Sequence, residues 1–284
     1  MNKLASQWMH LLQCRLFDLL PQHGLSRLAG YLAESKIIWL KNLLIRWFIR
    51  HYKIDLSAAQ SADLADYACF NAFFTRQLKA ELRPINRNAD VICSPVDGRI
   101  SQFGKIHQES LIQAKGINYS LPDLLQDQHS YMPFVDGQFI TLYLSPRDYH
   151  RVHMPMDGEL YRADYIPGTL FPVNQSSAHH VRGLFSRNER LVCYFNTPMG
   201  DFVLIMVGAM LVAGIETVWS KAQQSQLSTK PLTYSKGEEI GRFKFGSTVI
   251  LLFNKQTDLQ WQTHVQADKV LCFGETLAKP AITN

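Results

Sequence analysis

The bond between Gly246 and Ser247 is the part of the sequence best suited to unusual chemistry. It follows a charged turn at 236–239 and comes just before an apolar, β-branched run at 249–253. Glycine has no Cβ, so a nucleophile can approach its carbonyl closely, and the backbone can adopt φ values barred to other residues. The serine supplies a hydroxyl at the mouth of a predicted buried strand. If that hydroxyl attacks the Gly246 carbonyl, the amide becomes an ester, and elimination then cuts the chain and leaves a pyruvoyl group at position 247.

Such self-cleavage requires a general base for the serine and an acid that orients the base. A neutral imidazole, with a pKa near the working pH, suits the first task. The densest polar cluster, residues 144–155, carries His150 and His153 after an apolar strand at 139–144. Asp97, in an Asp-Gly turn, suits the second task because a carboxylate holds the imidazole tautomer and stabilises its cation. An aspartate, a histidine and a serine therefore form a candidate triad.

Each of these features also has a simpler interpretation. Gly-Ser-Thr is ordinary turn-to-strand sequence, and the two histidines could belong to a surface loop. The H-x-x-H spacing of His150 and His153 could instead indicate a metal site, with His179 or His180 as a third ligand. The sequence has no G-x-S-x-G elbow, no P-loop and no G-x-G-x-x-G, which argues against an ordinary serine hydrolase and against nucleotide chemistry.

Composition indicates an ordinary globular protein that leans apolar. The 284 residues are 46% hydrophobic and 19% charged, enough for one large domain or two small ones. A net charge of +5 and a pI near 8.9 favour anionic partners such as phospholipid head groups, but are too weak to indicate nucleic acid. Five scattered cysteines without a C-x-x-C pair are typical of a reduced, cytosolic protein with no disulfide framework and no thiolate zinc site: Cys14, Cys69, Cys93, Cys193 and Cys272.

The first sixty residues predict amphipathic helices at 4–20, 25–32 and 36–53. In the helix predicted at 36–53, large aromatic and aliphatic side chains lie next to cationic residues, which is typical of a helix at a lipid interface. The alternative is a helix that packs its apolar side on the domain core. Its polar ridge consists of Asn42, Arg46, Arg50 and Lys53.

No segment is expected to span a bilayer. The longest uncharged stretch, 202–215, is too short and contains two glycines, so it predicts a buried strand with a turn. Arg15 and Asp18 interrupt the N-terminal apolar pattern, which a secretory signal would not tolerate. We therefore expect the protein to stay in the cytoplasm.

The pattern of apolar and polar residues changes along the chain. Residues 61–83 predict another helix, ended by Pro84. From Ala89 onward, short alternating runs between Gly, Pro, Asn and Asp predict mostly antiparallel β-structure. The predicted fold class is α+β, with an N-terminal helical region at 1–60 and a β-rich catalytic domain at 61–284.

Five segments together resemble the phosphatidylserine decarboxylase family, over about residues 70 to 253. Phe245-Gly-Ser-Thr248 is similar to the family's self-processing Leu-Gly-Ser-Thr motif, with phenylalanine in place of leucine. That replacement keeps an apolar residue at a strand position. The other matching segments are 70–79 with Arg83-Pro84-Ile85, Ser94–Arg99, Tyr149–His153 and Ile166–Asn174.

The resemblance implies a pyruvoyl-dependent proenzyme that converts phosphatidylserine to phosphatidylethanolamine. It would cut itself into a β chain, 1–246, and an α chain, 247–284, whose pyruvoyl group comes from Ser247 and forms a Schiff base with the substrate. By motif, His153 would be the base for Ser247, Asp97 its partner, and His150 the proton donor in decarboxylation. Neither a metal nor pyridoxal phosphate is expected.

The resemblance also implies a peripheral enzyme on the cytoplasmic face of the bacterial inner membrane, where its substrate lies. The expected assembly is a heterodimer of its own α and β chains, with a higher homo-oligomer left open and no nucleic acid partner. Candidate phosphate contacts are Arg147, Arg151 and Arg182, and candidate pocket residues are Phe171, Val173 and Asn174.

Two other functions compete with this hypothesis. A pyruvoyl decarboxylase of a soluble amino acid would share the chemistry but would not need the basic amphipathic N-terminus. A non-enzymatic carrier is suggested by Asp-Gly turns like those of lipoyl domains, at Asp97, Asp136 and Asp157. Such domains need a lysine at a hairpin tip, and no Asp-Gly turn here has one beside it.

Overall fold

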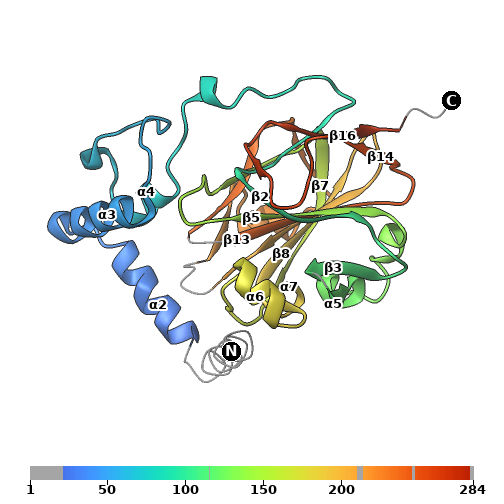
Figure 1. Cartoon of the computed structure of the whole chain (residues 1–284), viewed down its shortest axis with the longest axis horizontal. Coiled ribbons are helices and arrows are strands. Elements are labelled where there is room, and N and C mark those ends of the chain that lie inside the picture. The colour runs from blue at the N-terminus through green and yellow to red at the C-terminus, as the bar shows by residue number, and fades with distance from the viewer. Residues whose placement is uncertain (1–21, 115, 210–213, 245–246, 282–284) are drawn as a thin grey trace, which may run out of the picture.

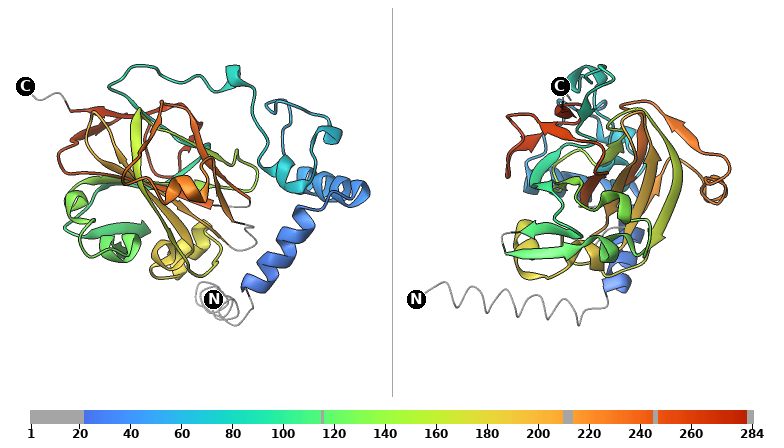
Figure 2. Two further views of the ribbon diagram at one scale, coloured as in Figure 1. Left: turned by 180° about the vertical axis from the view of Figure 1, so that it is seen from behind. Right: turned by 90° about the vertical axis from the view of Figure 1, so that its right-hand side faces the viewer.

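A large antiparallel sheet forms the centre of the molecule (Figures 1 and 2). The computed structural model describes residues 22–114, 116–209, 214–244 and 247–281. Eight strands make up the sheet, and every neighbouring pair is antiparallel, as the alternating apolar runs predicted. In spatial order they are β11 (Leu232–Tyr234), β7 (Gly158–Ile166), β8 (Arg190–Asn196), β9 (Phe202–Val207), β13 (Ser247–Phe253), β5 (Gln138–Leu144), β2 (Gly98–Lys105) and β15 (Val270–Leu271).

Strand β13 lies between β9 and β5 and is buried along its whole length. Successive side chains of a strand point to opposite faces. Val249 and Leu251 accordingly pack in one hydrophobic core, and Ile250 and Leu252 in another. A strand buried on both faces reads as a continuous apolar run, which explains the sequence pattern.

The first core lies between the large sheet and two small ones. One of these contains β6, which carries His153, and β12, which leads toward the Gly246–Ser247 bond. The strands of that sheet, in spatial order, are β10 (Ile215–Thr217), β12 (Glu239–Phe243) and β6 (Arg151–His153). The strands of the other small sheet are β1 (Ile92–Cys93), β16 (Thr276–Pro280) and β14 (Leu259–Trp261).

The second core lies on the opposite face of the large sheet, under a hairpin and short helices that Figure 1 shows grouped together. Its covering elements are β3 (Ser110–Ala114), β4 (Ile117–Ser120), α5 (Leu121–Leu125), α6 (Gln175–His180) and α7 (Leu184–Arg187). The remaining short helices of this part are η3 (Met132–Phe134) and α8 (Lys221–Gln224).

The N-terminal helices α2 (Gln22–Ala33) and α3 (Ile38–Tyr52) lie to one side of the sheet (Figure 1). They agree with the helices predicted at 25–32 and 36–53, whereas the helix predicted at 4–20 lies outside the described residues. Phe48 of α3 packs against Phe70, Phe73 and Phe74. Among the described helices, none is both long and apolar enough to cross a membrane.

The helix predicted at 61–83 is wrong. This region holds only η1 (Leu64–Asp66), α4 (Phe70–Phe74) and η2 (Ala80–Leu82). Side chains compete for the backbone hydrogen bonds that a helix would need, as when Asp63 accepts from the Ala65 amide. The chain also turns back on itself through a bridge between Ala59 and Leu78.

Candidate active site

Ser247 is the first residue of β13 and lies opposite Leu144, the last residue of β5. Its side chain is fully buried, and its Oγ has no hydrogen-bond partner among the described residues. By strand alternation it is on the same face as Val249, toward the core that also contains Val152 of β6. A buried hydroxyl without a partner costs about 1–3 kcal/mol, so this group requires an explanation. Phe245 and Gly246 lie outside the described residues.

His150 lies just before β6, in the segment that connects β5 to β6. On one side, its carbonyl accepts a hydrogen bond of 2.9 Å from the amide of Phe243, the last residue of β12. On the other, a turn joins it to Leu144, the strand partner of Ser247, and Asp148 closes that turn by accepting from the Ser145 amide at 2.7 Å. The candidate proton donor is therefore bonded to the end of β12 and follows the turn that leaves β5.

The His150 ring is held neutral. It is fully buried and stacks on Phe74 with 4.1 Å between ring centroids. Burial, and after it the nearby charge of Arg76, together lower its pKa to about 3, against the weaker opposing effect of the Ser145 and Pro146 backbone. Neither ring nitrogen makes a hydrogen bond of normal length with a described residue.

His153 belongs to β6 and lies opposite Glu239. Its Nδ1 is 2.9 Å from the Gly237 carbonyl, and its Nε2 is 2.9 Å from the Tyr149 hydroxyl. A carbonyl can only accept, so Nδ1 carries the proton and Nε2 accepts from Tyr149. Burial lowers the His153 pKa, which favours this neutral form. Gly237 has φ +87°, and a Cβ there would be 2.2 Å from Ile85, so the turn that presents its carbonyl requires glycine.

Asp97 is held by a bidentate contact with Arg83. The guanidinium Nε and Nη2 lie 2.9 and 2.5 Å from its two carboxylate oxygens, and the Phe273 amide donates to it at 2.8 Å. The Phe273 ring stacks on His153 at 3.9 Å. The Asp-Gly turn lies against β6 because the His153 amide donates to the Pro95 carbonyl at 2.9 Å. Asp97 and His153 are therefore linked through Phe273, without a direct hydrogen bond between their side chains.

A cavity of about 260 Å³ lies at this cluster, with Arg83, Tyr149, His153 and Phe273 in its wall. Sequence reasoning identified His153 and Asp97 but gave no role to these neighbours. Arg83 and Tyr149 fall within the motif segments, and that was an available signal. Phe273 falls in no motif, and only the tertiary structure brings it to His153.

The triad members are only partly brought together. Asp97 and His153 share one cluster, whereas no hydrogen bond joins the Ser247 Oγ to either histidine in the described part of the chain. The catalytic roles assigned by motif stay predictions.

The candidate substrate contacts are dispersed. Phe171 and Val173 are buried in the second core, and Asn174 caps α6 by accepting from the Ser177 amide. Arg151 pairs with Glu239 at 2.7 Å. The other two candidates, Arg147 and Arg182, are exposed.

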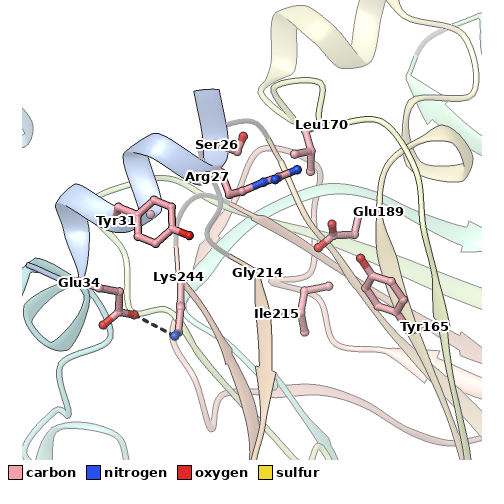
Figure 3. Close-up of a pocket in the computed structure, with 11 residues that line it drawn as sticks. Ser26, Arg27, Tyr31, Glu34, Tyr165, Leu170, Glu189, Gly214, Ile215 and Lys244 are labelled. Atoms are coloured by element: carbon pink, nitrogen blue, oxygen red, sulfur yellow. Dashed lines mark hydrogen bonds and ion pairs between the residues drawn. The ribbon is translucent and has the colours of Figure 1, made fainter. Parts of the chain in front are cut away.

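A larger cavity, of about 540 Å³, lies between α2 and a wall that includes Tyr165 of β7 and Ile215 of β10 (Figure 3). Arg27 and Tyr31 of α2 line one side, and Glu189 lines the other. Glu34, the residue directly after α2, pairs with Lys244 at 2.9 Å.

Within the described ranges, no group of three or more His, Cys, Asp and Glu side chains is arranged to hold a metal ion. The free cysteines there are Cys69, Cys93, Cys193 and Cys272, while Cys14 lies outside.

Comparisons with known proteins agree with the motifs. The family model described as phosphatidylserine decarboxylase matches residues 70–279, and a second, described as PSD, matches residues 13–53. A phosphatidylserine decarboxylase proenzyme of Ectopseudomonas mendocina is 48% identical over 271 residues, 91% of this chain and 94% of the relative. A relative with the same description from Alcanivorax borkumensis is 51% identical over 83% of this chain and 84% of its own length. Another, from Acinetobacter baylyi, is 47% identical over 92% of this chain and 93% of its own length. The chain belongs to the phosphatidylserine decarboxylase family.

The buried neutral histidines predict a stability that falls in acid. The folded pKa of His150, about 3, is below its ordinary value of 6.5. Between those values the unfolded chain binds a proton that the folded chain excludes, so stability is complete above about pH 6.5 and is lost as pH falls, by up to about 1.4 kcal/mol per unit for one histidine. Chemical denaturation from about pH 7 to about pH 4 measures this slope. His150→Asn should reduce the slope and the exposed His129→Asn should not; equal slopes in all three proteins would contradict the assignment.

Proposed function

We propose that this chain is a proenzyme that cuts itself between Gly246 and Ser247 and then decarboxylates phosphatidylserine to phosphatidylethanolamine. The observation that carries the proposal is the buried hydroxyl of Ser247, which has no hydrogen-bond partner among the described residues and lies at the start of a fully buried strand. Family membership supplies the substrate class.

Self-cleavage uses only atoms of the chain and water. The Ser247 Oγ bonds to the Gly246 carbonyl carbon, the C–N bond breaks, and the hydroxyl proton passes to the freed nitrogen. Loss of the Cα proton then breaks the Cβ–Oγ bond, releases the carboxylate at 246 and leaves dehydroalanine. Water replaces its nitrogen as ammonia, which gives the pyruvoyl group. Holding the hydroxyl against its own preceding carbonyl lowers the barrier by proximity, in principle by several kcal/mol.

His153 is the proposed base, and Asp97 its partner. The neutral ring has its lone pair on Nε2, as a base requires. That lone pair now accepts from Tyr149, so the tyrosine hydroxyl must either withdraw or pass the proton on. Asp97 contributes negative charge near the ring, which favours the imidazolium that forms.

The pyruvoyl group fits position 247, because the Ser247 hydroxyl from which it would form is buried and has no described hydrogen-bond partner. When formed, it supplies the electron sink for loss of carbon dioxide. His150 is the proposed donor of the proton that replaces the carboxyl group. Its dry surroundings favour loss of the carboxylate charge.

The two fragments are proposed to remain together as a heterodimer. Fragment 247–284 contains β13, β14, β15 and β16. Strand β13 stays paired with β5 and β9, and β16 with β1, so cutting the bond leaves these ladders intact.

The N-terminal region, 1–60, is proposed to attach the enzyme peripherally to the cytoplasmic face of the inner membrane. One side of α3 is buried through Ile45 and Phe48. Trp39, Leu43 and Trp47 are nevertheless 68%, 59% and 56% exposed. Large exposed apolar side chains beside basic residues suit a lipid interface.

Ser247→Ala should abolish cleavage, because it removes the attacking oxygen. Denaturing electrophoresis should show fragments 1–246 and 247–284 for the wild type and for the exposed control Ser235→Ala, and one uncut chain for Ser247→Ala. A cut Ser247→Ala chain would refute the assignment.

Variants of the two histidines test their roles. His153→Ala and Asp97→Asn should slow cleavage about 10²–10⁴-fold, the usual contribution of a placed proton-transfer group. His150→Ala should be cut yet lose decarboxylase activity. Cleavage time courses and carbon dioxide release measure the two steps separately. If His150→Ala blocks cleavage and His153→Ala spares it, the roles are reversed.

Replacing Trp39 and Trp47 together by glutamate should weaken binding to anionic vesicles by about tenfold or more, because two large apolar side chains no longer enter the lipid. Co-sedimentation measures binding. Met132→Glu, at a residue 59% exposed in η3, is the matched control. Unchanged binding of the double variant would exclude this surface.

Assays with free serine beside the phospholipid separate this function from that of a soluble amino-acid decarboxylase.

A further inference from the structure

Arg76 is a buried cation that has no counter-ion in the part of the chain that the structure describes. The residue is 5% exposed, yet its Nε and Nη1 have no hydrogen-bond partner among the described residues. Its Nη2 donates to the Arg147 carbonyl at 3.2 Å, and its guanidinium lies 5.4 Å from the centre of the Phe73 ring. No described carboxylate forms an ion pair with it.

Burying a guanidinium charge without a counter-ion costs free energy. Arginine stays protonated in proteins, and an uncompensated buried charge costs several kcal/mol. Burial lowers the Arg76 pKa, in keeping with that cost. A fork of donors with two unused N–H groups is suited to an oxyanion such as carboxylate or phosphate.

Arg76 adjoins the proposed catalytic site through two contacts. The Arg147 carbonyl that accepts from it lies in the turn between Leu144, the strand partner of Ser247, and His150. Two residues before Arg76, Phe74 stacks on the His150 ring. Arg76 therefore lies near His150, the group proposed to protonate the product, and its charge acts on that ring.

We infer that Arg76 binds the phosphodiester of the phospholipid head group, an inference that rests on the proposed function. The head group offers two anions, and their fates differ. The carboxylate loses its charge as carbon dioxide leaves, so an arginine clamped on it would stabilise the substrate more than the transition state. The phosphodiester keeps its charge throughout, so its binding by Arg76 affects substrate, transition state and product alike.

The inference predicts a particular kinetic pattern in the mature, cut enzyme. Arg76→Gln should raise KM for phosphatidylserine in mixed micelles about tenfold to a hundredfold, the range for a charged hydrogen bond, with little change in kcat. It should raise the inhibition constant of glycerophosphoethanolamine, which has the phosphodiester but no carboxylate, by the same factor. Arg76→Lys, which keeps the charge but loses the fork, should lie between. Lys230→Gln, which removes an exposed positive charge, should match the wild type.

The alternatives give different results. A fall in kcat with unchanged KM and unchanged inhibition by glycerophosphoethanolamine, in either Arg76 variant, would overturn the inference and assign Arg76 to the carboxylate or to His150. If Arg76→Gln does not fold, as judged by loss of self-cleavage, Arg76→Lys decides alone. A wild-type protein that neither cuts itself nor releases carbon dioxide would instead refute the proposed function.

Discussion

The account depends on one constraint, the burial of the Ser247 hydroxyl at the first position of β13. That strand is covered on both faces and paired on both sides, so the hydroxyl loses its contacts with water and gains no described partner in return. The pairing with Leu144 fixes the backbone of Ser247, directly after the bond proposed to be cut. We propose that a group in this position reacts with the chain itself.

The surroundings of the two histidines follow from the same packing. His150 stacks on the aromatic side chain of Phe74 in α4, is fully buried and is held neutral. His153 is held by a carbonyl and a hydroxyl, and by the ring of Phe273, in a cluster that includes Asp97. Two imidazoles three residues apart therefore have separate environments, which suits two different proton transfers.

Much of this could be predicted from the sequence. Alternating apolar runs predicted the antiparallel sheet, and helical spacing predicted α2 and α3, because local periodicity reports which face of an element is buried. The helix predicted at 61–83 failed because side chain to backbone bonds, such as that of Asp63, and the packing of Phe70 and Phe73 on α3 determine that segment. Residue type and motif identified the candidate groups Ser247, His153 and Asp97. The bidentate contact of Arg83 with Asp97 and the stacking of Phe273 on His153 involve residues that are distant in the sequence. The periodicity of apolar residues does not predict such contacts.

The most direct test of the central claim is the intact mass of the purified, active wild-type protein. The account predicts two polypeptides, and the smaller, 247–284, should have the mass expected when its N-terminal serine has become a pyruvoyl group. A fully active preparation that contains a single polypeptide of the encoded mass would contradict it.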